Sequence, residues 1–185
     1  MTKQYKCGVI GLGYVGLPLA LAFAKKFTVV GYDNNSKRIN ELQVGIDSNN
    51  EFTKKEIQES NQVLFSNSKE LLSSCNIFII TVPTPISKNK KPDLTSLKSA
   101  TSLVGEVMNK DTIVVYESTV YPGATEEVCI PILEKTSGLI ANKDFQYGYS
   151  PERINPGDKL NKIENITKIV SGSDKKTTNI INKIY

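Results

Sequence analysis

Residues 5–33 read YKCGVIGLGYVGLPLALAFAKKFTVVGYD, and this stretch decides the fold. Its first part, 5–10, is a short apolar run that predicts a buried strand. The glycine-rich turn GLGYVG follows at 11–16, and the leucine- and alanine-rich residues 17–26 predict a helix. Residues 27–32 predict a second strand. A strand, a glycine-rich turn, a helix and a second strand, in this order, are typical of a dinucleotide-binding unit.

The glycine spacing in this turn has a physical reason. Gly11 permits the tight turn, Gly13 lets a pyrophosphate approach the backbone, and Gly16 lets the helix pack closely on the strand. The N-terminus of the helix offers free N–H groups and the positive end of its dipole to the phosphates. Tyr14 and Val15 belong to the same turn, so we count them among the cofactor-binding residues.

An acid ends the second strand. Asp33 lies 22 residues after Gly11, where a carboxylate accepts hydrogen bonds from the adenosine ribose hydroxyls. A 2′-phosphate would face its negative charge, so the sequence favours NAD over NADP. Arg38 is a complication, because a nearby arginine can accommodate a 2′-phosphate. Two alternatives stay open: the glycines and the acid only make turns, or the architecture holds a mononucleotide or S-adenosylmethionine.

Strands and helices alternate through the rest of the chain. The further predicted strands are continuous apolar runs at 63–65, 76–82, 112–116, 145–149 and 168–171. The further predicted helices are at 36–44, 53–60, 68–74, 94–108, 124–135 (kinked or shortened by Pro131) and 175–185. Unbroken apolar strands between helices indicate a parallel sheet covered on both faces. We therefore expect an α/β, Rossmann-type, doubly wound fold.

The composition excludes several kinds of function. The chain of 185 residues contains no histidine, which excludes Ser-His-Asp and Cys-His nucleophile sites and histidine-ligated metals. Cys7, Cys75 and Cys129 form no CxxC pair and indicate a reducing compartment, so we expect a cytoplasmic protein without a metal site. The sequence has neither a membrane-spanning apolar run nor a basic stripe with aromatics, so we expect no membrane or nucleic-acid partner.

Three further segments carry a resemblance to a known family. Residues 81–85 read TVPTP, 117–123 read ESTVYPG and 150–157 read SPERINPG. Together with GLGYVGLPLA at 11–20, they resemble the UDP-glucose/GDP-mannose dehydrogenase family, in the family's order and over essentially the whole chain. Residues 1–185 look like its N-terminal NAD-binding domain. SPERINPG looks most like the branch that oxidises UDP-linked 2-acetamido sugars.

The resemblance implies an activity that this chain holds only in part. The family oxidises a sugar at C6 to the uronic acid in two NAD-dependent steps, through a thiohemiacetal and a thioester on a cysteine. That cysteine belongs to a C-terminal sugar-nucleotide domain, which follows a central dimerisation helix, and none of the three cysteines here matches its motif. We therefore expect an inactive fragment of a homodimeric, UDP-sugar-oxidising enzyme of bacterial surface-polysaccharide synthesis.

The resemblance also assigns cofactor contacts. Val82, Pro83 and Thr84 should lie along the NAD at the end of their strand. Arg38 matches a basic residue beside the adenosine ribose, so by resemblance it need not indicate NADP. Ligands of open α/β sheets bind beyond the carboxyl ends of the strands, and these assignments agree with that rule.

By the same resemblance, two residues take part in the chemistry. Ser118 and Thr119 match a polar pair near the nicotinamide, where the threonine helps to place the catalytic water, and Glu152 assists proton transfer and hydrolysis. From the residues alone, Thr119 could also cap a turn and Glu152 could be a surface carboxylate. Pro156 stands where glucose-oxidising members carry a second acid, which favours the acetamido-sugar branch.

Two other functions remain possible at this point. One is a stand-alone NAD-binding regulatory module without chemistry, which turnover by the complete protein would exclude. The other is a β-hydroxyacid-type dehydrogenase on the same fold, which would transfer hydride from small acids without needing a UDP group.

Overall fold

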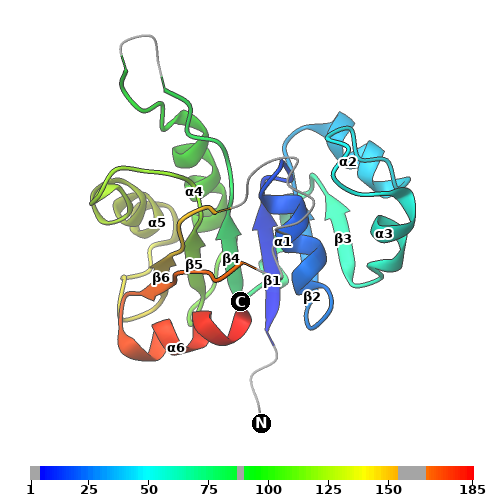
Figure 1. Ribbon diagram of the computed structural model, residues 1–185. Coiled ribbons are helices and arrows are strands. Elements are labelled where there is room, and N and C mark those ends of the chain that lie inside the picture. The colour runs from blue at the N-terminus through cyan, green and yellow to red at the C-terminus, as the bar shows by residue number, and fades with distance from the viewer. Residues whose placement is uncertain (1–4, 87–89, 154–165) are drawn as a thin grey trace.

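A computed structural model describes residues 5–86, 90–153 and 166–185 of the chain (Figure 1). Within these residues, seven strands form one sheet in the order β3-β2-β1-β4-β5-β6-β7. The strands are β1 (Lys6–Ile10), β2 (Thr28–Tyr32), β3 (Val63–Ser66), β4 (Ile77–Ile80), β5 (Ile113–Tyr116), β6 (Gln146–Tyr149) and β7 (Ser171–Gly172). All neighbouring pairs from β3 to β6 are parallel, and β7 is antiparallel to β6. The predicted doubly wound fold is confirmed.

Helices cover both faces of this sheet. They are α1 (Gly16–Phe23), α2 (Ser36–Gln43), α3 (Lys54–Glu59), η1 (Lys69–Ser74), α4 (Thr95–Val107), η2 (Thr125–Cys129), α5 (Ile130–Ser137) and α6 (Lys175–Ile184). One buried core joins α1, α2, α3 and α6 to alternate strand residues such as Val9 and Ile79. A second core joins α4 and α5 to the other strand residues, such as Ile10 and Ile80, which alternate with those of the first core. Successive strand residues point to opposite faces, so unbroken apolar strands serve both cores.

Three predicted elements differ from the structure. The helix predicted at 68–74 is the 3₁₀ helix η1, which spans Lys69–Ser74. The helix predicted at 124–135 begins as the π-helical turn η2, which runs directly into α5, and Pro131 stands in the first turn of α5. The strand predicted at 168–171 is wrong in place: β7 begins only at Ser171, which is paired with Tyr149, the last residue of β6.

The strand register places the loops that matter at one edge. Ile10 is level with Tyr32 and with Ile80, Ile80 with Tyr116, and Tyr116 with Tyr149. The glycine turn and the loops after β2, β4, β5 and β6 therefore leave the same edge of the sheet. The connections run in opposite directions from β1, so the sheet has its topological switch point between β1 and β4, where such folds bind ligands. None of the described helices is long and apolar enough to cross a membrane.

Candidate cofactor site

The glycine turn between β1 and α1 is held at its start by its neighbours. Gly11 has φ +94°, in the region that favours glycine. Its N–H donates to the carbonyl oxygen of Tyr32 over 2.8 Å. The hydroxyl of Thr81 lies 2.7 Å from the Gly11 carbonyl oxygen. The role predicted for Gly11, a tight turn, fits this geometry.

The other two glycines have opposite surroundings. A Cβ on Gly16 would lie 1.7 Å from the Gly11 carbonyl oxygen, so the helix packs too closely there for any side chain. A Cβ on Gly13 would meet no described atom within 4 Å. Tyr14 is exposed and Val15 half-buried, and Val15 provides no side-chain cap for α1. The turn thus presents open space in front of a helix N-terminus, which suits a phosphate.

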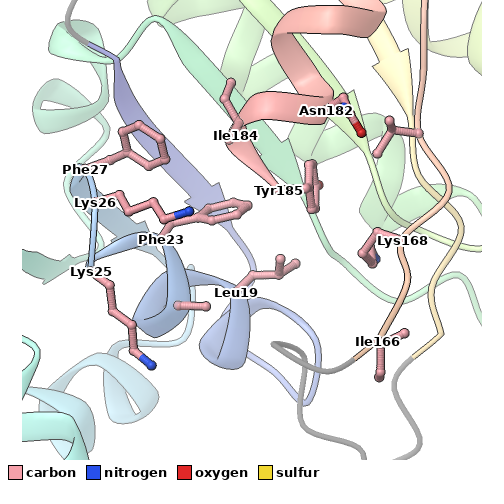
Figure 2. Close-up of a pocket in the computed structure, with 12 residues that line it drawn as sticks. Leu19, Phe23, Lys25, Lys26, Phe27, Ile166, Lys168, Asn182, Ile184 and Tyr185 are labelled. Carbon is pink, nitrogen blue, oxygen red and sulfur yellow. The ribbon is translucent and has the colours of Figure 1, made fainter.

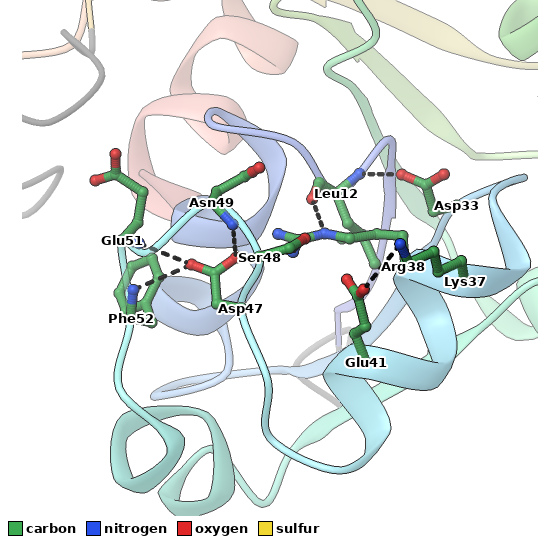
Figure 3. Close-up of polar contacts among 10 residues, drawn as sticks. All are labelled: Leu12, Asp33, Lys37, Arg38, Glu41, Asp47, Ser48, Asn49, Glu51 and Phe52. Atoms are coloured by element: carbon green, nitrogen blue, oxygen red, sulfur yellow. Dashed lines mark hydrogen bonds and ion pairs between the residues drawn. The ribbon is translucent and has the colours of Figure 1, made fainter.

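Asp33 has a structural task that its position in the sequence does not reveal. Its half-buried carboxylate accepts the N–H of Leu12 over 2.8 Å (Figure 3). It also accepts the N–H of Asn35 over 2.9 Å. The acid therefore fixes the glycine turn from the end of β2. Each carboxylate oxygen has a second lone pair, so both bonds leave acceptor capacity for ribose hydroxyls.

Arg38, in the first turn of α2, is buried with only 7% of its surface exposed. Its Nε donates to the carbonyl oxygen of Leu12 over 2.9 Å. One terminal nitrogen, Nη1, lies 2.8 Å from the carboxylate of Asp47 and donates to the hydroxyl of Ser48 over 3.2 Å (Figure 3). The other, Nη2, is buried and has no hydrogen-bond partner among the described residues. Arg38 thus also braces the glycine turn.

Sequence reasoning missed Asp47. Its carboxylate accepts three backbone N–H groups of its own loop, from Asn49 over 3.2 Å, Glu51 over 2.9 Å and Phe52 over 3.1 Å. An aspartate in a polar stretch after a glycine predicts such a turn. The pairing with Arg38 is a tertiary contact that no local pattern indicates.

The loops after β4 and β5 are joined to each other. The Ser118 hydroxyl donates to the carbonyl oxygen of Val82 over 2.6 Å, and the Thr84 hydroxyl donates to that of Thr119 over 2.5 Å. Ser118 is buried, while Thr119 and Pro83 are exposed at the edge. The structure therefore brings together the residues predicted along the cofactor with those predicted near the nicotinamide.

Glu152 follows β6 at the same edge. It is half-buried, and its Oε1 accepts the N–H of Arg153 over 2.6 Å. Thr119 and Glu152 thus leave the ends of two adjacent parallel strands, whose last residues Tyr116 and Tyr149 are level. Pro156 lies outside the described residues.

A buried polar cluster behind this edge was also missed. The Nζ of Lys168 lies 2.7 Å from Oε2 of Glu117, with 7% and 0% of their side chains exposed. The Tyr185 hydroxyl donates to Oε1 of Glu117, and Lys168 also reaches the carbonyl oxygen of Pro151 over 3.4 Å. Burial raises the pKa of Glu117, while Lys168 opposes that shift. The cluster joins the residue before Ser118 to the residue before Glu152.

The same cluster borders a pocket of about 330 Å³ on the α1 side of the sheet (Figure 2). Lys168 and Tyr185 share its lining with apolar residues of α1 such as Leu19 and Phe23. The Tyr185 ring packs edge-on against Phe23, with ring centroids 5.2 Å apart. This pocket is separate from the glycine turn, so it does not belong to the candidate cofactor site.

Comparison with known proteins decides the family. Residues 5–185 match the UDP-glucose/GDP-mannose dehydrogenase family, NAD binding domain. This chain belongs to that family. It is 54% identical over 183 residues to UDP-N-acetyl-D-glucosamine 6-dehydrogenase of Pseudomonas aeruginosa, covering 99% of this chain and 43% of the relative. It is 53% identical over 177 residues to Protein CapL of Staphylococcus aureus, covering 96% and 42%.

A solved structure agrees. The UDP-D-ManNAc dehydrogenase of Pyrococcus horikoshii superposes with a TM-score of 0.89 at 34% identity, covering 97% of this chain and 44% of that one. The family, the Rossmann-type fold and NAD as the cofactor, all predicted from sequence, are thus confirmed. The alternatives of a mononucleotide or S-adenosylmethionine ligand are set aside. The chain spans less than half the length of the relatives it matches.

Proposed function

We propose that this chain, residues 1–185, is the NAD-binding domain of a nucleotide-sugar 6-dehydrogenase. The enzyme oxidises a UDP-2-acetamido sugar to its uronic acid in two NAD-dependent steps. The observation that carries this proposal is the 54% identity with a UDP-N-acetyl-D-glucosamine 6-dehydrogenase across 99% of the chain. The product suits the synthesis of a surface polysaccharide, and a homodimer in the cytoplasm is the form in which we expect the enzyme to work.

The residues at the carboxyl edge fit the cofactor. The open space over Gly13 admits a pyrophosphate, and the Asp33 carboxylate keeps acceptor capacity for the ribose. Beyond them, Val82, Pro83 and Thr84 line the path toward the nicotinamide end, where Ser118 and Thr119 stand. When bound, NAD accepts the hydride, and the protein contributes position and electrostatics.

Within this chain, which has no histidine, other groups must handle protons. Glu152 is the acid whose place, at the end of the strand next to β5, suits exchange of a proton with the sugar or the attacking water. Thr119 is exposed at the adjacent strand end, and its backbone carbonyl is fixed by Thr84. A hydroxyl on a backbone fixed in this way can orient the water that hydrolyses the thioester.

The nucleophile for the thioester is not one of the three cysteines here. Burial raises the pKa of Cys7 to about 12 and that of Cys75 to about 11. Burial also raises the pKa of Cys129. A thiol that stays protonated at neutral pH is a poor nucleophile. The covalent step therefore belongs to a part of the enzyme outside this chain, which accords with its 43% share of the relative's length.

Turnover by the complete enzyme tests the proposal. The enzyme should form two NADH for each UDP-N-acetylhexosaminuronate from UDP-GlcNAc, UDP-GalNAc or UDP-ManNAc, with UDP-glucose as the poor substrate. The 185-residue chain alone should bind NAD and form no NADH. Binding without turnover by the complete protein would support a regulatory module instead. Hydride transfer from small hydroxy acids without a UDP group would indicate a β-hydroxyacid dehydrogenase.

A further inference from the structure

Asp33 and Arg38 grip the same backbone residue. The Asp33 carboxylate accepts the N–H of Leu12, and the Arg38 Nε donates to the Leu12 carbonyl oxygen (Figure 3). Asp33 is the acid at the ribose position, so Arg38 stands close to where the 2′ substituent of an adenosine would lie. In NADP-binding proteins an arginine at such a place pairs with the 2′-phosphate.

The charge of Arg38 is, however, already paired inside the protein. Asp47 lies 2.8 Å from Nη1, and only 8% and 0% of the two side chains are exposed. Asp47 itself cannot swing aside easily, because the N–H groups of Asn49, Glu51 and Phe52 all donate to its carboxylate. A charge paired at this distance and depth is screened little by salt and presents little net field to a ligand.

We propose that Asp47 is a specificity-determining residue for the cofactor. By neutralising Arg38, it leaves the Asp33 carboxylate as the dominant charge at the adenosine end of the site. A dinucleotide with a free 2′-hydroxyl is then accepted, and one with a 2′-phosphate meets net repulsion. The preference for NAD thus depends on two acids: Asp33, which faces the ribose, and Asp47, which neutralises the charge of Arg38.

The buried Nη2 of Arg38 shows why loss of the Asp47 charge should alter the cofactor preference. That nitrogen has no hydrogen-bond partner among the described residues, so the guanidinium keeps an unused donor. Removal of the negative charge of Asp47 leaves this guanidinium with an uncompensated positive charge. A 2′-phosphate beside it would then be attracted by that charge, even with Asp33 unchanged.

The substitution Asp47→Asn tests the proposal, because asparagine removes the negative charge and keeps one oxygen, which can still accept the N–H groups of Glu51 and Phe52. Its NH2 group replaces the oxygen that accepts the N–H of Asn49, so a double substitution is needed to separate charge from structure. Calorimetric titration of this chain with NAD and NADP should show the ratio of the two affinities move toward NADP by about tenfold, or ~1.4 kcal/mol. The affinity for NAD itself should change far less. Ser48→Ala is the matched control, because it removes a hydrogen bond to the same Nη1 without a change of charge.

A double substitution separates charge from structure. In Arg38→Met/Asp47→Asn the ratio should return to that of the unsubstituted chain, because no arginine remains to be released. Equal weakening of NAD and NADP by Asp47→Asn, or the same ratio shift in Ser48→Ala, would overturn the proposal and leave Asp47 a purely structural residue. If Asp47→Asn does not melt cooperatively, Asp47→Ser carries the same test, since its hydroxyl oxygen can still accept a loop N–H.

Discussion

Two buried ion pairs stand near the carboxyl edge of the sheet, and they are built differently. Arg38 and Asp47 are nine positions apart, and the acid also takes three N–H groups from its own loop. Glu117 and Lys168 are 51 positions apart, and the acid takes the lysine ammonium and the Tyr185 hydroxyl. The first pair clamps the glycine turn, and the second joins the loops after β5 and β6.

The difference shows how each charge is compensated. The backbone donors of Asp47 stay in place whatever happens to Arg38, so that carboxylate has support independent of its partner. Glu117 depends on side chains from distant segments, so loss of either one leaves a buried carboxylate poorly compensated. Buried ion pairs in general add little stability but are costly to break from one side. The two pairs should therefore respond unequally to loss of their cation.

The largest expected effect is at Lys168. The substitution Lys168→Met should lower the free energy of unfolding by about 3–5 kcal/mol, because it leaves Glu117 buried without its cation. Urea denaturation at neutral pH measures this. Lys175→Met, on an exposed lysine of α6, should stay within about 0.5 kcal/mol of the unsubstituted chain.

A second substitution locates the cause. In Lys168→Met/Glu117→Gln most of the lost stability should return, because no charge is left buried. If the double substitution is as unstable as Lys168→Met alone, packing of the lysine stem, rather than the orphaned carboxylate, accounts for the loss.

The corresponding change in the other pair should cost less. Arg38→Met removes the bond to Leu12 and the pair with Asp47, but the three N–H donors still compensate the acid. We expect a loss of about 1.5–3 kcal/mol, the usual value for a hydrogen bond to a charged group. The same urea titration measures it, and a loss as large as that of Lys168→Met would break the distinction between the two pairs.

Substitution of Asp33, which also holds the glycine turn, should affect both NAD affinity and stability. Asp33→Ala should weaken NAD by about tenfold or more, or ~1.4 kcal/mol, because charged acceptors of the ribose hydroxyls are lost. It should also lower the melting temperature, because Leu12 loses its brace. Calorimetry and thermal melting measure the two effects.

Gly13→Ala is the matched comparison for Asp33→Ala. The added methyl meets no described atom within 4 Å, so the melting temperature should hardly change. It would stand where the pyrophosphate approaches the backbone, so most NAD binding should be lost. A large loss of stability with binding intact would mean that Gly13 serves the fold alone.

The two regions also differ in how far the sequence predicts them. The glycine turn, Asp33 and the apolar strands are local patterns, and the dinucleotide-binding fold follows from their spacing. The family is suggested by the resemblance of residues 11–20, 81–85, 117–123 and 150–157. The bond between Asp33 and Leu12 and the pair of Arg38 with Asp47 are tertiary contacts across the turn. Local spacing places their elements but not their partners.

The second region was less predictable still. Glu117 looks in the sequence like any acid after a strand, and its partners come 51 and 68 positions later. The misplaced strand at 168–171 has a similar cause. In the antiparallel pair, Ser171 faces Tyr149, the last residue of β6, so the residues before Ser171 lie past the end of that strand. Apolar character predicted an extended segment there, but the end of its partner strand decides where it pairs.

The smallest effect, a pH dependence, tests whether Glu117 is compensated as poorly as the structure indicates. Burial raises the pKa of Glu117 above its ordinary value of 4.5, so the folded chain binds the proton more tightly than the unfolded chain. The contribution of this group is therefore fully present below pH 4.5 and is lost as the pH rises through the folded-state pKa. Glu117→Gln, which resembles the protonated acid, lacks this titration. Urea denaturation from acid to neutral pH should show the unsubstituted chain losing stability relative to Glu117→Gln as the pH rises. The opposite slope would mean that Lys168 and Tyr185 outweigh the burial, and that Glu117 is as well supported as Asp47.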